Sequence, residues 1–407
     1  MSSPDPSHHV DLSTLPRGFR FSGICAGIKR ETDREDISLL VSDSPATAAG
    51  VYTTNRVCAA PVVIDRALTP GEGFRAVAIN SGNANACTGD RGLLDAKKMA
   101  STTATALGTS QDSVLVLSTG IIGEFLPMDR VISGLGQAHA NLGDDAPSVV
   151  AAARGMMTTD TRPKMFTSQF MHAEKSHSLL GLAKGAAMIG PNMATMLGVV
   201  LTDVALNPDD AQRILEYVVT KTFNCISVDG HTSTNDTVLL LANGGDAEEP
   251  LHTTALSSFQ DTLLQCCDSL ARDIIDDGEG ATHVIRIEVR GCANEQDAHE
   301  IAKAIADSPL VKTAVHGADP NWGRIVSAAG YSGIAFDPNK LVLHLNGFLL
   351  FENGGPVSFN DEKVSASIRD TRETLIELDL QSGTDHIRFY SSDLTAEYVR
   401  LNADYHT

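Results

Sequence analysis

The segment from Gly181 to Gly198 reads GLAKGAAMIGPNMATMLG, and its composition decides how the rest of the chain is interpreted. It is apolar and rich in glycine, with Lys184 and Thr195 as its only reactive side chains. By composition alone, the segment predicts a buried strand, a turn and a second strand. Its functional interpretation makes Thr195 a nucleophile, and a threonine hydroxyl needs a base within hydrogen-bonding distance for that role.

The peptide bond before Thr195 indicates where this base would come from. If the chain is cut between Ala194 and Thr195, the new α-amine belongs to the nucleophile itself. The ordinary pKa of an α-amine is about 8, near working pH, whereas the amide nitrogen of an uncut chain is not a base. Because Ala194 is small, the Thr195 hydroxyl has room to attack the preceding carbonyl, so we expect the cut to be autocatalytic.

Charge and hydropathy restrict the partners. The chain has 407 residues and a formal net charge of −20 at pH 7. This charge repels phosphate backbones and anionic membrane surfaces, so neither nucleic acid nor a membrane is an expected partner. No apolar run reaches the roughly 18–20 residues of a membrane helix, and the first residues lack the features of a signal peptide. These patterns predict a cytoplasmic protein of two or three domains.

The motifs of several common sites are missing. The seven cysteines include no C-x-x-C pair, and the thirteen histidines form no cluster with metal-ligand spacing. Neither a G-x-x-x-x-G-K-S/T phosphate loop nor a G-x-S-x-G hydrolase motif occurs. We therefore expect reduced thiols, no metal and no bound cofactor.

Strands and helices are expected in mixed order, which favours an α+β fold over a doubly wound parallel sheet. Asn207-Pro208 is a helix start, and Asn346-Gly347 is a hairpin turn. The pattern of predicted strands and helices changes near residues 282–290, where we expect a domain boundary. Strands are predicted over Leu39–Val41, Ala76–Asn80, Ser113–Leu117, His283–Val289, Leu341–Leu345, Phe348–Glu352, Leu375–Leu380 and His386–Tyr390, and helices over Asp95–Leu107, Thr253–Ile275, Glu295–Ala306 and Leu394–Arg400.

The segment around Thr195 closely resembles the self-cleaving site of the ornithine acetyltransferase family, the bifunctional ArgJ proteins of arginine biosynthesis. Six further blocks match this family in order, which makes the resemblance specific from residue 80 to the end of the chain. They are Asn80–Gly89, Ser118–Gly123, Met157–Lys164, Asp277–Thr282, Val311–Arg324 and Glu397–Thr407.

The resemblance implies an architecture. A layered α-β-β-α sandwich like that of DmpA-type aminopeptidases is expected over residues 1–285, with a smaller α+β domain over residues 286–407. The cut would separate an α chain, 1–194, from a β chain starting at residue 195. The two chains are expected to stay together in one folded unit and to pair as an α2β2 heterotetramer.

The resemblance also implies roles for individual residues. The Thr119 hydroxyl and the Gly120 N–H would form an oxyanion hole, which acyl transfer needs because negative charge develops on the carbonyl oxygen. Lys184 can meet a carboxylate, Glu279 can meet the cationic amine of ornithine, and Asn402 can hold an amide. The family's substrate-binding positions fall on Thr158, Lys184, Thr195, Glu279, Asn402 and Thr407.

The implied reaction moves acetyl from N2-acetylornithine to Thr195 and then to glutamate. Acetyl-CoA stays open as a second donor, although no separate CoA motif is found. The alternative class is an aminopeptidase or amidase, which would use the same exposed threonine with water as acceptor. An unprocessed, inactive binding protein is a third interpretation, and the intact Ala194-Thr195 and Thr119-Gly120 pairs argue against it.

Overall fold

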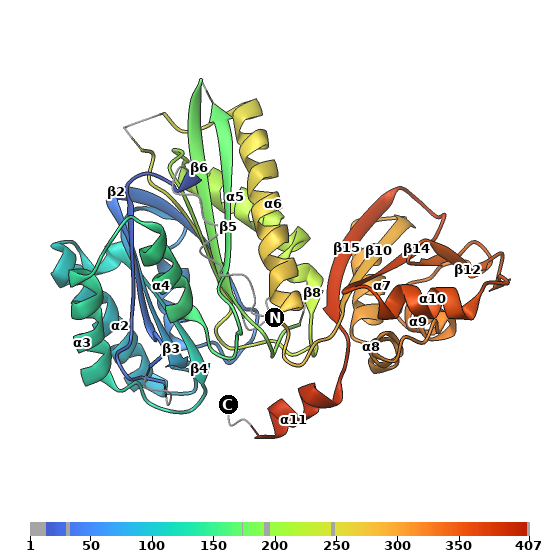
Figure 1. Ribbon diagram of the computed structural model, residues 1–407. Helices are drawn as coiled ribbons and strands as arrows, with labels where there is room; N and C mark the ends of the chain where they lie inside the picture. Colours follow the sequence, from blue (N-terminus) through green and yellow to red (C-terminus); the bar gives the residue numbers. More distant parts are fainter. Residues whose placement is uncertain (1–13, 30–32, 173, 191–195, 246–248, 405–407) are drawn as a thin grey trace.

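The computed structural model describes residues 14–29, 33–172, 174–190, 196–245 and 249–404. They form two lobes, each built on one mixed β-sheet (Figure 1). The sheet of the first lobe has eight strands in the order β4-β3-β2-β9-β7-β6-β5, with β1 paired to β2. Its strands are β1 (Phe19–Ile24), β2 (Ile37–Tyr52), β3 (Gly71–Asn83), β4 (Val114–Ile121), β5 (Lys164–His172), β6 (Lys175–Lys184), β7 (Leu197–Thr202) and β9 (Thr237–Ala242).

The long strand β2 folds this sheet into two layers. Its first half pairs with β3, from Ile37 opposite Asn80, and its second half pairs with β9, from Thr47 opposite Ala242. Side chains of both halves meet in one core, where Leu40 and Leu115 lie in the same cluster as Leu180, Val199 and Leu239. Strands β7 and β9 are therefore buried on both faces.

Helices cover both outer faces of the folded sheet. The face of β2, β3 and β4 packs against α1 (Ala60–Leu68), α2 (Gly89–Leu107) and α3 (Met128–Ala140). The opposite outer face packs against α5 (Pro208–Lys221) and α6 (Thr253–Asp276), while α4 (Ala146–Met156) packs into the core between the layers. This is the predicted α-β-β-α sandwich.

The second lobe is a seven-stranded sheet with helices over a single apolar core. Two segments cross between the lobes: β8 (Ile226–Ser227) pairs with β15, and α11 (Ala396–Asp404) lies away from the second sheet, toward the first lobe (Figure 1). A division at residue 285 would pass through β10. The other elements of this lobe are β10 (Val284–Cys292), β11 (Val342–Leu345), β12 (Phe348–Glu352), β13 (Gly355–Pro356), β14 (Glu373–Asp379), β15 (Asp385–Ser392), α7 (Glu295–Ala306), α8 (Pro309–His316), α9 (Trp322–Gly330) and α10 (Asp361–Arg369).

Most predicted elements are present, with two corrections. The helix expected over Asp95–Leu107 begins at Gly89, because the Asn85 side chain donates to the Gly92 carbonyl (2.9 Å) and anchors the first turn. Strand β4 continues through Ile121, so Thr119 and Gly120 lie within the end of the strand instead of after it. No helix among the described residues is long and apolar enough to cross a membrane.

Candidate active site

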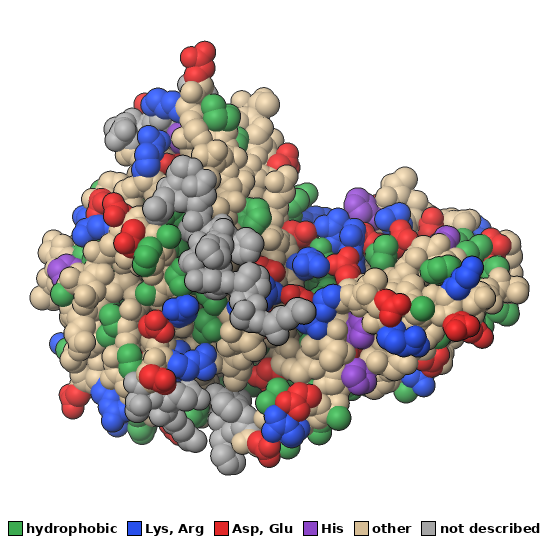
Figure 2. Space-filling model, viewed as in Figure 1, with side chains coloured by type: hydrophobic (Ala, Val, Ile, Leu, Met, Phe, Trp, Pro, Cys, Tyr) green, Lys and Arg blue, Asp and Glu red, His purple; other side chains and the backbone are tan. Residues whose placement is uncertain are grey.

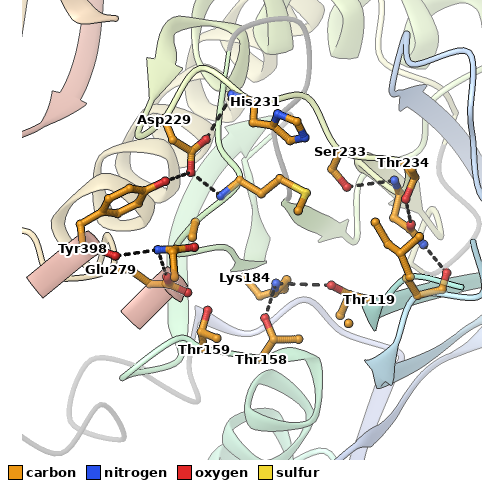
Figure 3. A pocket seen from close by; sticks show the side chains of 17 residues that line it. Thr119, Thr158, Thr159, Lys184, Asp229, His231, Ser233, Thr234, Glu279 and Tyr398 are labelled. Atoms are coloured by element: carbon orange, nitrogen blue, oxygen red, sulfur yellow. Dashed lines mark hydrogen bonds between the residues drawn. The ribbon is translucent and has the colours of Figure 1, made fainter. Parts of the chain in front are cut away.

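Six of the predicted site residues line one cavity of about 290 Å3 in the first lobe (Figure 3). They come from segments far apart in the chain, and α11 supplies the last of them. The predicted Ala194, Thr195 and Thr407 lie outside the described residues. The six are Thr119, Gly120, Thr158, Lys184, Glu279 and Asn402.

Lys184 links two of the threonines. It ends strand β6 and is buried, and its Nζ donates to Thr158 Oγ1 at 2.7 Å and to Thr119 Oγ1 at 3.4 Å (Figure 3). A hydroxyl that accepts a hydrogen bond still has its own proton to donate. The Thr119 hydroxyl is therefore able to donate into the cavity, as an oxyanion hole requires.

Gly120 occupies a position that only glycine fits. Its φ of +133° lies in a region that other residues avoid, and a Cβ there would lie 2.3 Å from the carbonyl carbon of Gly82. Gly82 is its partner across the β3–β4 ladder. The two strands therefore approach closely at the cavity wall, and this approach fixes the backbone of the predicted oxyanion hole.

A buried ion-pair cluster holds the loops that carry Thr158 and Lys184. The Lys164 ammonium lies 2.7 Å from Asp160 and 2.6 Å from Asp277, and all three side chains are almost fully buried. Asp160 also accepts from the backbone N–H groups of Thr158 (3.0 Å) and Gly185 (2.7 Å). Burial by itself raises the pKa of Asp160, but the Lys164 and Lys184 ammonium groups outweigh it, so this pKa lies well below its usual value.

Sequence reasoning missed this cluster, although Asp160 and Lys164 belong to a block that it singled out. The signal was an acidic and a basic residue four positions apart beside a predicted substrate-binding threonine. Such a pair is normally a solvated helix pair. Only the third member, Asp277, more than one hundred residues away, makes the pair a buried triad.

Glu279 and Asn402 close the cavity from the side of α11. Asn402 Nδ2 donates to Glu279 Oε2 at 2.9 Å, and the Glu279 N–H donates to the Ala186 carbonyl at 2.8 Å. Glu279 is half-buried, so its carboxylate is in contact with the cavity. The second carboxylate at this side, Asp229, was not predicted. It accepts from the Tyr398 hydroxyl (3.1 Å) and from the N–H groups of Met188 and Ile189.

The backbone of Met196 is hydrogen-bonded to the opposite wall of the cavity, which the segment around Asn235 forms. Asp236 accepts from the N–H groups of Met196 and Ser233, both at 3.2 Å, and burial raises the pKa of Asp236 to about 7. The preceding residue, Asn235, donates to the carbonyl groups of Ala84 (2.6 Å) and Ser118 (2.8 Å). Asp236 is therefore a second carboxylate that was not predicted, and it lies beside Met196, the residue that follows Thr195.

Within the described parts of the chain, no group of three or more His, Cys, Asp or Glu side chains could hold a metal ion. The buried carboxylates Asp160 and Asp277 are paired with Lys164. The described lining of the cavity carries hydroxyl, amide, ammonium and carboxylate groups and the imidazole of His231 (Figure 3).

Comparison with known proteins places these residues in a family. The model of the ArgJ family matches residues 20–407. The arginine biosynthesis bifunctional protein ArgJ of Rhodopirellula baltica is 45% identical over 410 residues, covering 100% of this chain and 98% of that protein. The protein of the same name from Thermotoga neapolitana is 43% identical, covering 97% of this chain and 100% of that protein.

Solved structures include ornithine acetyltransferase of Mycobacterium tuberculosis in complex with ornithine. It is 35% identical, with a TM-score of 0.39, and the match covers 44% of this chain and 93% of that one. The relatives from Rhodopirellula and Thermotoga match almost from end to end, and the family model spans nearly the whole chain. This chain therefore belongs to the ArgJ family.

Proposed function

We propose that this protein moves an acetyl group from N2-acetylornithine to glutamate and that Thr195 carries the acetyl group between them. Membership of the ArgJ family supports this function, as does a relative solved with ornithine bound. The observation that carries the proposal is the cavity itself. It brings the predicted oxyanion pair together with a buried cation, Lys184, and a carboxylate, Glu279. These are the groups that an acetylated diamino acid requires.

The chemistry needs one proton relay. The α-amine of Thr195 takes the proton of the Thr195 hydroxyl, whose oxygen attacks the acetyl carbonyl. The Thr119 hydroxyl and the Gly120 N–H donate to the resulting oxyanion. As the oxyanion collapses, the carbon–nitrogen bond breaks, and the α-amine returns the proton to the departing amine of ornithine. The glutamate amine then attacks the acetyl ester by the same steps.

Charge orients the donor in the cavity. Lys184 is the cation for the substrate's α-carboxylate, and its bonds to Thr158 and Thr119 hold the ammonium in place. Burial lowers the pKa of Lys184, and the nearby Asp160 carboxylate limits that decrease. Glu279 is the acceptor for the side-chain ammonium of ornithine, with Asn402 fixing one of its oxygens.

Several finer features belong to the same proposal. Self-cleavage between Ala194 and Thr195 yields chains of residues 1–194 and 195–407, and the two chains pair as an α2β2 heterotetramer in the cytoplasm. Asp229 and Asp236 support this step, because they hold the backbone at Met188–Ile189 and at Met196, on both sides of the proposed cut. Acetyl-CoA serves as a second acetyl donor.

The test separates donor from acceptor. Incubation with acetylornithine alone should release ornithine and leave the chain that begins at Thr195 one acetyl group heavier by intact mass spectrometry. Later addition of glutamate should release acetylglutamate, and acetyl-CoA alone should give the same acetylated chain. Thr195→Ala should show neither cutting nor acetylation. Release of free acetate at the rate of donor consumption would instead indicate a hydrolase, and full activity from an uncut chain would contradict the proposed nucleophile.

A further inference from the structure

A second cavity adjoins the first and shares part of its wall. Its volume is about 500 Å3, and Thr158, Thr159 and Glu279 line both cavities. Nothing in the family's sequence motifs as described above assigns a role to this space. Its most distinctive group is Lys29, which follows strand β1 and lies on the cavity wall.

Lys29 is a buried cation with little to neutralise it. Its residue is 7% exposed, and among the described residues its Nζ donates only to the carbonyl of Glu35, with no carboxylate within 4 Å. The adjacent Asp36 carboxylate is occupied by the backbone N–H groups of Ala26, Ile28 and Lys29. Because an ammonium has three N–H donors, Lys29 keeps donors for a ligand. Leaving such a group unpaired away from water is costly.

Packing fixes Lys29 next to the predicted oxyanion hole. A Cβ added at Gly82 would lie 3.0 Å from Lys29 Cγ and 3.2 Å from its backbone, so Lys29 packs directly on Gly82. Gly82 in turn pairs with Gly120. Burial lowers the pKa of Lys29 to about 8, with Arg34 as the next cause, and Lys184 contributes as well. Lys29 therefore belongs electrostatically to the catalytic region while remaining mostly protonated near neutral pH.

The two proposed substrates pose opposite demands on one pocket. Ornithine has a side-chain ammonium, which Glu279 attracts, whereas glutamate has a side-chain carboxylate, which Glu279 repels. One pocket can take both in turn only if a second, cationic position lies within reach of the same bound amino acid. Lys29 lies in the cavity on the other side of the wall that Glu279 shares.

The geometry points to Lys29 as the group that binds the side-chain carboxylate of the acceptor amino acid, in the second cavity. This inference rests on the proposed function and adds the residue that selects the acceptor. Among the described residues, the other charged groups on this cavity are Arg34, Glu124, Asp404 and Glu279. These described groups amount to two cations, with Lys29, and three carboxylates. Such a lining suits one carboxylate bound to one buried ammonium better than it suits a polyanion such as a phosphorylated carrier.

The experiment measures the two halves of the reaction separately. Lys29→Met keeps much of the side chain and removes its charge, and the exposed Lys97→Met on α2 is the matched control. Formation of acetyl-enzyme from acetylornithine should stay within about twofold of the wild type. Discharge of the acetyl-enzyme should show a KM for glutamate raised by at least about tenfold, because a charge-assisted hydrogen bond is lost. The preference for glutamate over the neutral isostere glutamine should shrink by the same factor.

A second measurement uses the wild-type protein, so its result does not depend on whether the variant folds correctly. Reductive methylation of Lys29, read by peptide mass spectrometry, should be slowed by glutamate and not by an equal concentration of glutamine. Equal protection by both, or an unchanged glutamate preference in Lys29→Met, would overturn the inference while leaving the proposed function intact. A raised KM for acetyl-CoA alone would overturn it in favour of a polyanionic donor. Absence of any acetyl-enzyme in the wild type would overturn the proposed function and this inference together.

Discussion

The two lobes each hold a network of charged side chains, and the two networks differ in their contact with water. In the first lobe, Lys164, Asp160 and Asp277 form a triad with side-chain exposures of 0%, 0% and 4%. Asp236 is also buried beside the cavity. In the second lobe, Arg388 and Arg286 flank Glu288, whose side chain is only 5% exposed, whereas both arginines are about a third exposed or more.

The two networks contribute unequally to stability because they differ in their contact with water. Exposed ion pairs contribute about 0.2–1 kcal/mol each, because water and salt screen them. A buried charge costs several kcal/mol unless it is paired and hydrogen-bonded, so it persists only where its partners are fixed. Figure 2 shows acidic and basic side chains intermingled on the outside of the second lobe. The buried triad of the first lobe therefore depends on fixed partners, whereas the arginines of the Glu288 network stay in contact with water.

The largest expected effect comes from breaking the buried triad. Lys164→Met leaves Asp277 buried without its cation and Asp160 with only the more distant Lys184 at 3.9 Å, so the free energy of unfolding should fall by about 3–5 kcal/mol. Acetyl transfer should be lost with it, because Asp160 holds the Thr158 and Gly185 backbone. Urea unfolding and the donor half-reaction measure the two effects. A variant as stable and active as the wild type would mean that the interior charges are not required.

The next effect is a pH dependence that belongs to Asp236. The unfolded carboxyl loses its proton near its ordinary pKa of 3.8, whereas the folded one holds it until about pH 7. Rising pH therefore favours the unfolded state across this interval, and the wild type should lose up to about 4 kcal/mol of stability from this group.

The nontitrating variant Asp236→Asn isolates that contribution. The difference in unfolding free energy between wild type and variant should decline as the pH rises from about 4 to about 7, measured by urea unfolding at several pH values. Parallel curves for the two proteins would show that Asp236 does not titrate in this range and that burying its carboxylate costs less stability than expected.

A smaller effect is expected on substrate use. Glu279→Gln should weaken the use of acetylornithine by about 1.5–3 kcal/mol in kcat/KM, because a charge-assisted bond to the side-chain ammonium is lost. Binding of glutamate should change less. The matched control is Glu377→Gln, which removes the charge of a partly exposed carboxylate paired with Arg290 in the second lobe and should change neither. Equal losses for both substrates would remove Glu279 from its selective role.

The smallest effect is expected in the partly exposed Glu288 network of the second lobe. Arg388→Gln should lower the free energy of unfolding by only about 0.2–1 kcal/mol, since Glu288 keeps Arg286 as a partner. The loss should shrink further in high salt. A loss of several kcal/mol that salt does not change would show that this network is as important to stability as the buried triad.

Local signals explain why much of the fold was predictable. Asn207 caps α5 by accepting from the Asp210 N–H, and Asn346-Gly347 forms the β11–β12 turn with φ of +48° and +79°. These features act within a few residues, so the sequence carries them directly. Trp322 stacks on Phe351 with ring centroids 5.5 Å apart and packs against the core of the second lobe.

By itself, the sequence determined the family resemblance and predicted both the nucleophile segment around Thr195 and the residue types of the site, because these depend on short motifs. Only the tertiary structure decided that Asp277 completes the triad, that Asp229 and Asp236 flank the predicted cut, and that Lys29 faces a cavity bordered by Glu279. The physical reason is distance along the chain. Burial and pairing of a charge depend on which remote segments fold against it, and the charge pattern of one segment does not encode its partner.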